Sequence, residues 1–122
     1  MTKRVLLVED TEDIAMLVQV ALEDIGLQVY HANNGGKAMA YLETNTPDLI
    51  LLDIGLPGMS GWQLLDAIKG QRKQENYKVI MLTAMTDPAN RVIGKMQDVD
   101  GYIAKPFDIA QLKQIVGEVL QS

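Results

Sequence analysis

Short apolar runs of strand length alternate along this chain with segments whose apolar residues recur at the period of a helix. The apolar runs are continuous rather than alternating, which is typical of strands covered on both faces, as in a parallel sheet. The longer runs are Val5–Val8, Leu49–Leu52 and Val79–Leu82, and shorter ones lie at Gln28–Ala32 and Tyr102–Ala104.

The helical segments fill the intervals between these runs. The first ends at Gly26, and the fourth is predicted to begin at Asp87-Pro88 and to be short or mobile because Gly94 weakens it. Five strands alternating with five helices predict a doubly wound α/β sheet, whose functional crevice lies at the carboxyl ends of its strands. The apolar positions that define the helices are Ile14, Leu17, Val18, Ala21, Leu22 and Ile25; Ala38, Met39 and Leu42; Leu64, Leu65 and Ile68; Val92, Ile93 and Met96; and Ile109, Leu112, Ile115, Val116, Val119 and Leu120.

Length and charge narrow the class of protein. With 122 residues the chain is expected to form a single domain over residues 1–122, with no output domain in it. A net charge of −5 argues against direct nucleic-acid binding, and the absence of cysteine excludes disulfides and thiolate metal sites. The apolar run near the N-terminus is too short for a signal peptide or a membrane span. We therefore expect a cytoplasmic domain that contacts neither membrane nor nucleic acid.

Polar groups follow four of the predicted strands at the point where each strand ends. Glu9 and Asp10 follow the first run, Asp53 the third, Thr83 the fourth and Lys105 the fifth. Each has a structural explanation when taken alone, such as capping of the first helix by Asp10. Because the carboxyl ends of parallel strands meet at one edge, we expect three carboxylates, a hydroxyl and an ammonium to lie together there.

Such a cluster predicts a particular chemistry. Three neighbouring carboxylates repel one another and raise their proton affinity unless a cation compensates. Oxygen ligands without His or Cys nearby favour Mg²⁺. A carboxylate beside such a cation, a lysine ammonium and a threonine hydroxyl is well placed to attack phosphorus. Asp53 is therefore the candidate for a covalent phosphoacceptor that forms an acyl phosphate, with Lys105 and Thr83 as the other candidate catalytic residues and Lys105 stabilising the transferring group.

At these positions the chain resembles the receiver (response-regulator) domains of two-component signalling, the chemotaxis receiver family, over residues 3–120. The sequence VED at residues 8–10 is similar to the family's acidic pair, which implies that Asp10 binds the metal directly and Glu9 through water. The sequence DIGLPGMSG at residues 53–61 resembles the phosphoacceptor loop, with the Gly55 carbonyl as a further metal ligand. The resemblance implies a flavodoxin-like fold with strand order 2-1-3-4-5.

The same resemblance implies a switch. Thr83 and Ala84 match the switch hydroxyl and the small residue after it, and Tyr102 matches the rotating switch aromatic. Lys105-Pro106 matches a pair whose peptide bond is usually cis. Phosphorylation would then draw Thr83 toward the phosphoryl group and Tyr102 inward, changing the surface of the fourth helix, fifth strand and fifth helix.

The expected function is that of a phosphoacceptor in a two-component system or phosphorelay. A histidine kinase or histidine phosphotransfer protein would donate the phosphoryl group, and a downstream effector protein or a missing output domain would receive the signal. The domain would be no enzyme beyond catalysing its own aspartyl phosphorylation and dephosphorylation. Two departures from the family pattern matter: Gly55 lacks a side chain that would influence the lifetime of the phosphorylated state, and residues 96–100 lack a Gly-Ala pair before the last strand.

Three other hypotheses remain open. An aspartyl phosphohydrolase acting on small molecules would place a second acid where Gly55 stands. A flavodoxin-like carrier would need a glycine-rich phosphate cradle after the first strand, where the sequence has VEDTED. A binding module that is never phosphorylated would not need the complete set of acids, threonine and lysine. His31, the only histidine, is interpreted as structural.

Overall fold

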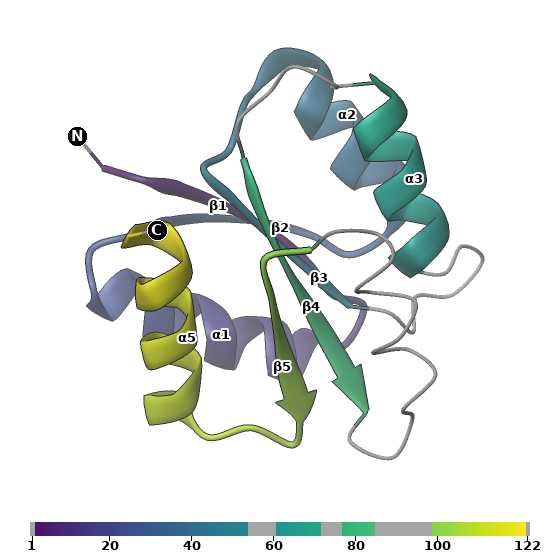
Figure 1. Ribbon diagram of the computed structural model, residues 1–122. Coiled ribbons are helices and arrows are strands. Elements are labelled where there is room, and N and C mark those ends of the chain that lie inside the picture. The colour runs from purple at the N-terminus through teal and green to yellow at the C-terminus, as the bar shows by residue number, and fades with distance from the viewer. Residues whose placement is uncertain (1, 54–60, 72–76, 85–98, 122) are drawn as a thin grey trace.

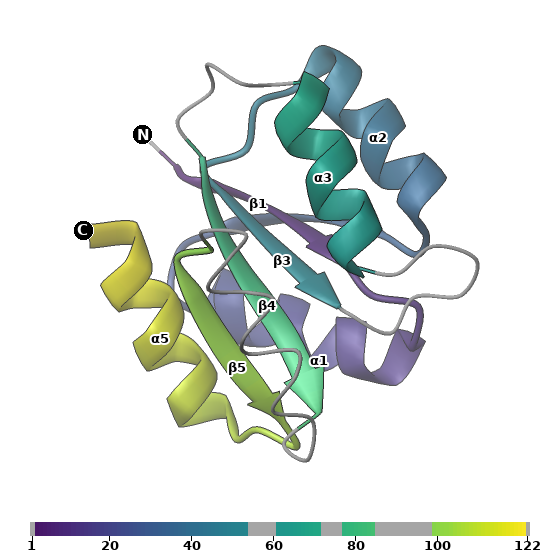
Figure 2. The same cartoon turned by 45° about the vertical axis from the view of Figure 1, so that its right-hand side comes forward.

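The computed structural model, which describes residues 2–53, 61–71, 77–84 and 99–121, is built on one parallel sheet (Figure 1). The strand order is β2-β1-β3-β4-β5, which confirms the predicted topology. All four neighbouring pairs are parallel, so the strands end at the same edge of the sheet, toward which the arrowheads point in Figure 2. The strands are β1 (Arg4–Val8), β2 (Gln28–Ala32), β3 (Leu49–Asp53), β4 (Lys78–Ala84) and β5 (Gly101–Lys105).

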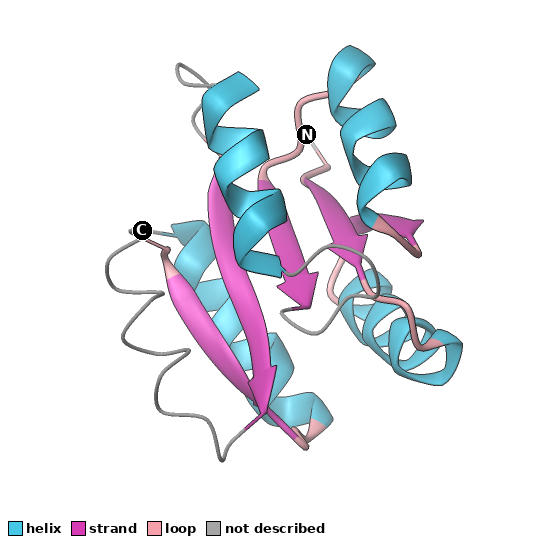
Figure 3. Ribbon diagram, turned by 90° about the vertical axis from the view of Figure 1, so that its right-hand side faces the viewer, coloured by secondary structure: helices cyan, strands magenta, loops and turns pink. Residues whose placement is uncertain are grey.

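Helices cover both faces of this sheet. In the described residues four of the five predicted helices are present: α1 (Glu12–Asp24), α2 (Gly35–Thr44), α3 (Gly61–Gln71) and α5 (Ile109–Gln121). One face is covered by α1 and α5, and the other by α2 and α3 (Figure 3). The helix predicted to begin at Asp87-Pro88 lies outside the described residues. No helix in the described residues is both long and apolar enough to cross a membrane.

The two layers explain why the strands read as continuous apolar runs. Along β3, Leu49 and Leu51 point into the core beneath α1 and α5, whereas Ile50 and Leu52 point into the core beneath α2 and α3. All four side chains are completely buried. Successive side chains of a strand point to opposite faces, so a strand covered on both faces must be apolar at every position.

The ends of α1 follow from local sequence. Glu12 and Asp13 place negative charge in its first turn, where the helix dipole is positive. Thr11 is the N-cap residue but makes no side-chain capping bond. At the other end Gly26 adopts a φ of 87°, a left-handed conformation that glycine reaches without strain. The chain then enters β2 directly.

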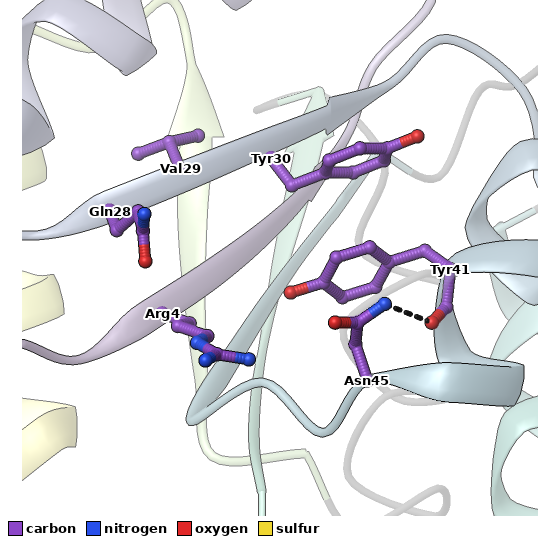
Figure 4. A pocket seen from close by; sticks show the side chains of 6 residues that line it. All are labelled: Arg4, Gln28, Val29, Tyr30, Tyr41 and Asn45. Atoms are coloured by element: carbon purple, nitrogen blue, oxygen red, sulfur yellow. Dashed lines mark hydrogen bonds between the residues drawn. The ribbon is translucent and has the colours of Figure 1, made fainter.

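A surface pocket of about 290 Å³ lies at the opposite edge of the sheet from the strand ends considered below. Its wall is a pair of stacked tyrosines, Tyr30 of β2 and Tyr41 of α2, whose ring centroids are 4.5 Å apart (Figure 4). Asn45 donates a hydrogen bond to the Tyr41 carbonyl and closes the end of α2. The remaining lining residues, Arg4, Gln28 and Val29, lie at the starts of β1 and β2. The stack therefore fastens α2 to the edge strand.

Candidate functional site

Three acids meet at the carboxyl edge of the sheet. Glu9 and Asp10 follow β1, and Asp53 is the last residue of β3. The two strands are neighbours in register, with Val8 opposite Leu52, so Glu9 and Asp53 are brought level with each other. One carboxylate oxygen from each of the three acids lies within 4.8 Å of the other two. The structure thus brings together the three acids that the strand ends predicted.

Burial distinguishes these three acids. Glu9 is completely buried, Asp53 is 6% exposed and Asp10 is exposed. One oxygen of Glu9, Oε1, accepts a hydrogen bond from the Thr11 backbone N–H at 3.2 Å. The other oxygen, Oε2, lies 3.1 Å from Nζ of Lys105, and the same ammonium lies 3.2 Å from Oδ2 of Asp53. Lys105 therefore bridges the two buried carboxylates, while Asp10 faces solvent.

The charges of the cluster are only partly balanced. Burial raises the pKa of Glu9, the negative charge of Asp53 raises it further, and Lys105 offsets part of this rise. Burial acts against the protonated form of Lys105, but the charges and hydrogen bonds of Asp53 and Glu9 outweigh it and raise the lysine pKa. Lys105 is therefore held as an ammonium ion, and it contacts two of the three carboxylates in the cluster.

This donor set fits a hard divalent cation. The three acids offer only oxygen ligands, and one ammonium, that of Lys105, contacts two of them. Mg²⁺ prefers such oxygens and commonly uses one or two carboxylates while retaining water ligands. Asp10, being exposed, offers a ligand atom on the solvent side. Gly55, the predicted carbonyl ligand, lies outside the described residues.

The fourth and fifth strands bring the remaining predicted residues to the same edge. Asp53 is opposite Leu82, so the next residue of β4, Thr83, lies at the end of the sheet beside it, although only the backbone of Thr83 and Ala84 is described. Ala84 is in turn opposite Lys105. The Lys105–Pro106 peptide bond is cis, as the resemblance implied.

Tyr102 is the second residue of β5. Its ring is partly buried against the core beneath α2 and α3, and burial raises the pKa of its hydroxyl. In the sheet it is opposite Met81 of β4. Its position three residues before Lys105 places it on the strand that carries the lysine. The rotation implied for it stays a prediction.

One contact at this edge was not foreseen from the sequence. The ring Nε2 of His31 lies 2.7 Å from the backbone carbonyl oxygen of Glu9. His31 was interpreted only as a structural residue at the end of the second strand. The one indication of this contact in the sequence was the position of His31 near the end of the predicted second strand. Because β2 lies beside β1 and ends where the acidic pair begins, a side chain there is close to Glu9.

Replacing Glu9 by Gln is expected to flatten the pH dependence of stability. Because the folded-state pKa of Glu9 is raised, the folded protein binds a proton more tightly than the unfolded chain does. The contribution of Glu9 to the free energy of unfolding should therefore fall as the pH rises from the ordinary carboxyl range through its folded-state pKa. An amide cannot titrate, so the Glu9→Gln variant should lose this decline.

Urea unfolding without divalent cations, from about pH 4 to about pH 8, measures this dependence. The exposed Glu43 of α2 provides a matched control, and Glu43→Gln should keep the decline of the unmodified protein. An equal decline in Glu9→Gln and the unmodified protein would contradict the prediction.

The doubly wound parallel sheet and the acids and lysine at its carboxyl edge define a receiver-type α/β domain. The family model for the response regulator receiver domain matches residues 5–117. The chain belongs to this family of receiver domains of response regulators.

Individual relatives agree with this assignment. The phosphate regulon transcriptional regulatory protein PhoB of Klebsiella pneumoniae is 37% identical over 123 residues, covering 98% of this chain and 54% of PhoB. The alkaline phosphatase synthesis transcriptional regulatory protein PhoP of Bacillus subtilis is 34% identical over 121 residues, covering 99% of this chain and 50% of PhoP. The chain thus spans about half the length of the curated relatives it matches.

Solved structures show the same fold. The chemotaxis response regulator CheY4 of Vibrio cholerae superposes with a TM-score of 0.88 at 30% identity, covering 98% of this chain and 99% of CheY4. A CheY-like response regulator receiver domain protein from Methanospirillum hungatei gives a TM-score of 0.90 at 32% identity, covering 99% of this chain and 95% of that protein.

Proposed function

We propose that this domain accepts a phosphoryl group on Asp53 from a phosphohistidine of a histidine kinase or histidine phosphotransfer protein. The observation that carries the proposal is the setting of Asp53 at the end of β3. Its carboxylate is nearly buried, lies 3.2 Å from the Lys105 ammonium and shares the strand edge with Glu9 and Asp10. This is the environment that an aspartyl nucleophile for phosphorus requires.

In the proposed reaction a carboxylate oxygen of Asp53 forms a bond to phosphorus while the bond from phosphorus to the donor imidazole nitrogen breaks. The Lys105 ammonium, already beside Oδ2 of Asp53, stabilises negative charge on the transferring group. Glu9, Asp10, Asp53 and the Gly55 carbonyl would hold Mg²⁺, which when bound compensates the charge of the carboxylates and the phosphoryl oxygens. Because Asp53 is only 6% exposed, its burial limits water access to the reacting atoms.

Phosphorylation is proposed to act through Thr83 and Tyr102. The phosphoryl group adds negative charge and acceptor oxygens at the end of β3, next to the end of β4 where Thr83 lies. Ala84 and Pro106 would shape the loops that contact it. Inward movement of Tyr102 would then change the surface formed by the predicted fourth helix, β5 and α5, as a shift between two packings.

The output is proposed to lie outside this single domain. Its matched relatives are named as transcriptional regulatory proteins, and the chain spans about half of their length. A downstream effector protein or a separate output domain would therefore read the altered surface. The net charge of −5 favours a protein partner over nucleic acid for this domain itself. We place it in the cytoplasm and assign it no enzymatic activity beyond its own phosphorylation and dephosphorylation.

Incubation with acetyl phosphate or phosphoramidate and Mg²⁺, followed by intact mass spectrometry, tests this function. The expected result is a single added phosphoryl group, because one carboxylate holds the nucleophilic position. Chelation of the metal before the donor is added should prevent the gain in mass. A protein that gains no mass from either donor, or gains it equally after chelation, would contradict the proposal.

A further inference from the structure

The backbone of Glu9 is held on both sides by the last two residues of β2. Its N–H donates to the Ala32 carbonyl at 3.2 Å, and its carbonyl oxygen lies 2.7 Å from Nε2 of His31. A carbonyl oxygen can only accept a hydrogen bond, so Nε2 of His31 must carry the proton and donate. The contact joins positions that are 22 residues apart in the sequence.

The hydrogen bond from His31 lies at the point where the regular backbone pairing of β1 with β2 ends. The β1–β2 pairing ends with Leu7 opposite His31 and Val8 opposite Ala32, so Glu9 is the first residue beyond the paired strand. From there the chain turns toward α1. The imidazole therefore supplies a partner for a backbone carbonyl at the point where the chain leaves the sheet.

This bond fixes a particular peptide group. The carbonyl of Glu9 belongs to the planar peptide unit that joins Glu9 to Asp10, so fixing its direction fixes the plane from which both acidic residues extend. Glu9 has further restraints, because its carboxylate contacts Thr11 and Lys105. In the described part of the chain no side-chain hydrogen bond restrains the exposed carboxylate of Asp10. The placement of Asp10 therefore depends on its backbone.

We propose that His31 is a positioning residue for the divalent-cation site, holding the Glu9–Asp10 peptide group in the orientation that directs both carboxylates toward Asp53. This role rests on the proposed function, since it concerns the same metal site. In this role His31 would contact neither the cation nor the phosphoryl group. It acts through the peptide group, as outer partners of metal ligands act by fixing ligand orientation.

Three substitutions separate the hydrogen bond from the bulk of the ring. In glutamine the side-chain nitrogen is as many bonds from Cβ as Nε2 is in histidine, so His31→Gln can keep the donor. His31→Phe fills the ring volume without a donor, and in His31→Asn the amide is one bond too short to reach. His31→Phe and His31→Asn therefore lack the hydrogen bond to the Glu9 carbonyl, and His31→Gln is the matched variant that retains it.

The first measurement is Mg²⁺ affinity by isothermal titration calorimetry on the folded proteins. The dissociation constant should rise about tenfold in His31→Phe and His31→Asn, at the lower end of the effect of losing an outer partner of a metal ligand. His31→Gln should bind Mg²⁺ with a dissociation constant close to that of the unmodified protein. If His31 only packed at the end of β2, replacing it would lower the stability of the protein without changing the Mg²⁺ dissociation constant of the folded protein.

The second measurement needs no metal. Amide hydrogen exchange by NMR should be faster at Glu9 and Thr11 in the Phe and Asn variants, because the Thr11 amide bonds the Glu9 carboxylate. The Ala38 amide in α2, bonded to the Asn34 carbonyl, is a control that should not change. His31→Gln should show the exchange rates of the unmodified protein.

The two measurements distinguish two kinds of failure. If the unmodified protein does not bind Mg²⁺, the proposed function is overturned and the role of His31 with it. If the unmodified protein binds Mg²⁺ and the folded Phe or Asn variant binds it equally well, only the positioning role is overturned. Weaker binding in both variants, with recovery in His31→Gln, supports the role.

Discussion

Replacing Asp53 by Asn is expected to abolish phosphoryl transfer to the domain completely. The amide has almost the volume of the carboxylate, so the packed end of β3 should stay in place. It carries no negative charge and is not a nucleophile toward phosphorus at neutral pH. Lys105 would keep its contact with Glu9 at 3.1 Å and so remain at the site. Intact mass spectrometry after treatment with acetyl phosphate and Mg²⁺ should show no added phosphoryl group.

The chain offers a matched control at the opposite end of the same strand. Asp48 directly precedes β3, and its carboxylate accepts a hydrogen bond from the Arg4 backbone N–H at 2.8 Å. Asp48→Asn makes the same chemical change away from the carboxyl edge and should be phosphorylated like the unmodified protein. A phosphoryl group on folded Asp53→Asn would show that another side chain is the acceptor.

Truncating either of two adjacent residues in β3 is expected to destabilise the protein strongly. Ile50→Ala and Leu51→Ala should each lower the free energy of unfolding by about 2–5 kcal/mol, since each leaves a cavity in a core. The two side chains are fully buried but lie in different cores, one beneath α2 and α3 and the other beneath α1 and α5. Large effects at neighbouring positions are the signature of a strand covered on both faces.

Urea unfolding followed by far-UV circular dichroism measures both effects. Met16, on the outer side of α1 and 66% exposed, is the control, and Met16→Ala should change the free energy of unfolding by no more than about 0.5 kcal/mol. A near-neutral result at Ile50 or at Leu51 would mean that one face of the sheet is open to water, contrary to the two-layer arrangement.

Most of the sheet could be predicted because its physical requirements are local. A strand buried on both faces needs an apolar residue at every position, and the run at residues 49–52 meets this need and corresponds to β3. Helical periodicity likewise placed α1 and α5. The strand order came from the resemblance to receiver domains, since local periodicity does not specify which strands are neighbours.

The sequence predicted which residues form the candidate site, but not how their side chains are buried and which of them contact one another. Glu9, Asp53 and Lys105 were expected at one edge because each directly follows an apolar run predicted to be a strand of a parallel sheet. The sequence did not predict that Glu9 would be completely buried while Asp10 beside it stays exposed. The bridge from Lys105 to both buried carboxylates was not predicted either. These features depend on the directions of side chains at the strand ends.

By itself, then, the sequence of this protein determined the alternation of strands and helices and the acids and lysine that follow the strands. Both are properties of neighbours along the chain, fixed by burial and by backbone geometry. Only the tertiary structure decided which acid is buried, that Lys105 bridges the two buried carboxylates, and that the His31 ring contacts the backbone carbonyl of Glu9. Those features join positions 22 to 96 residues apart, and strand register and side-chain packing set such distances.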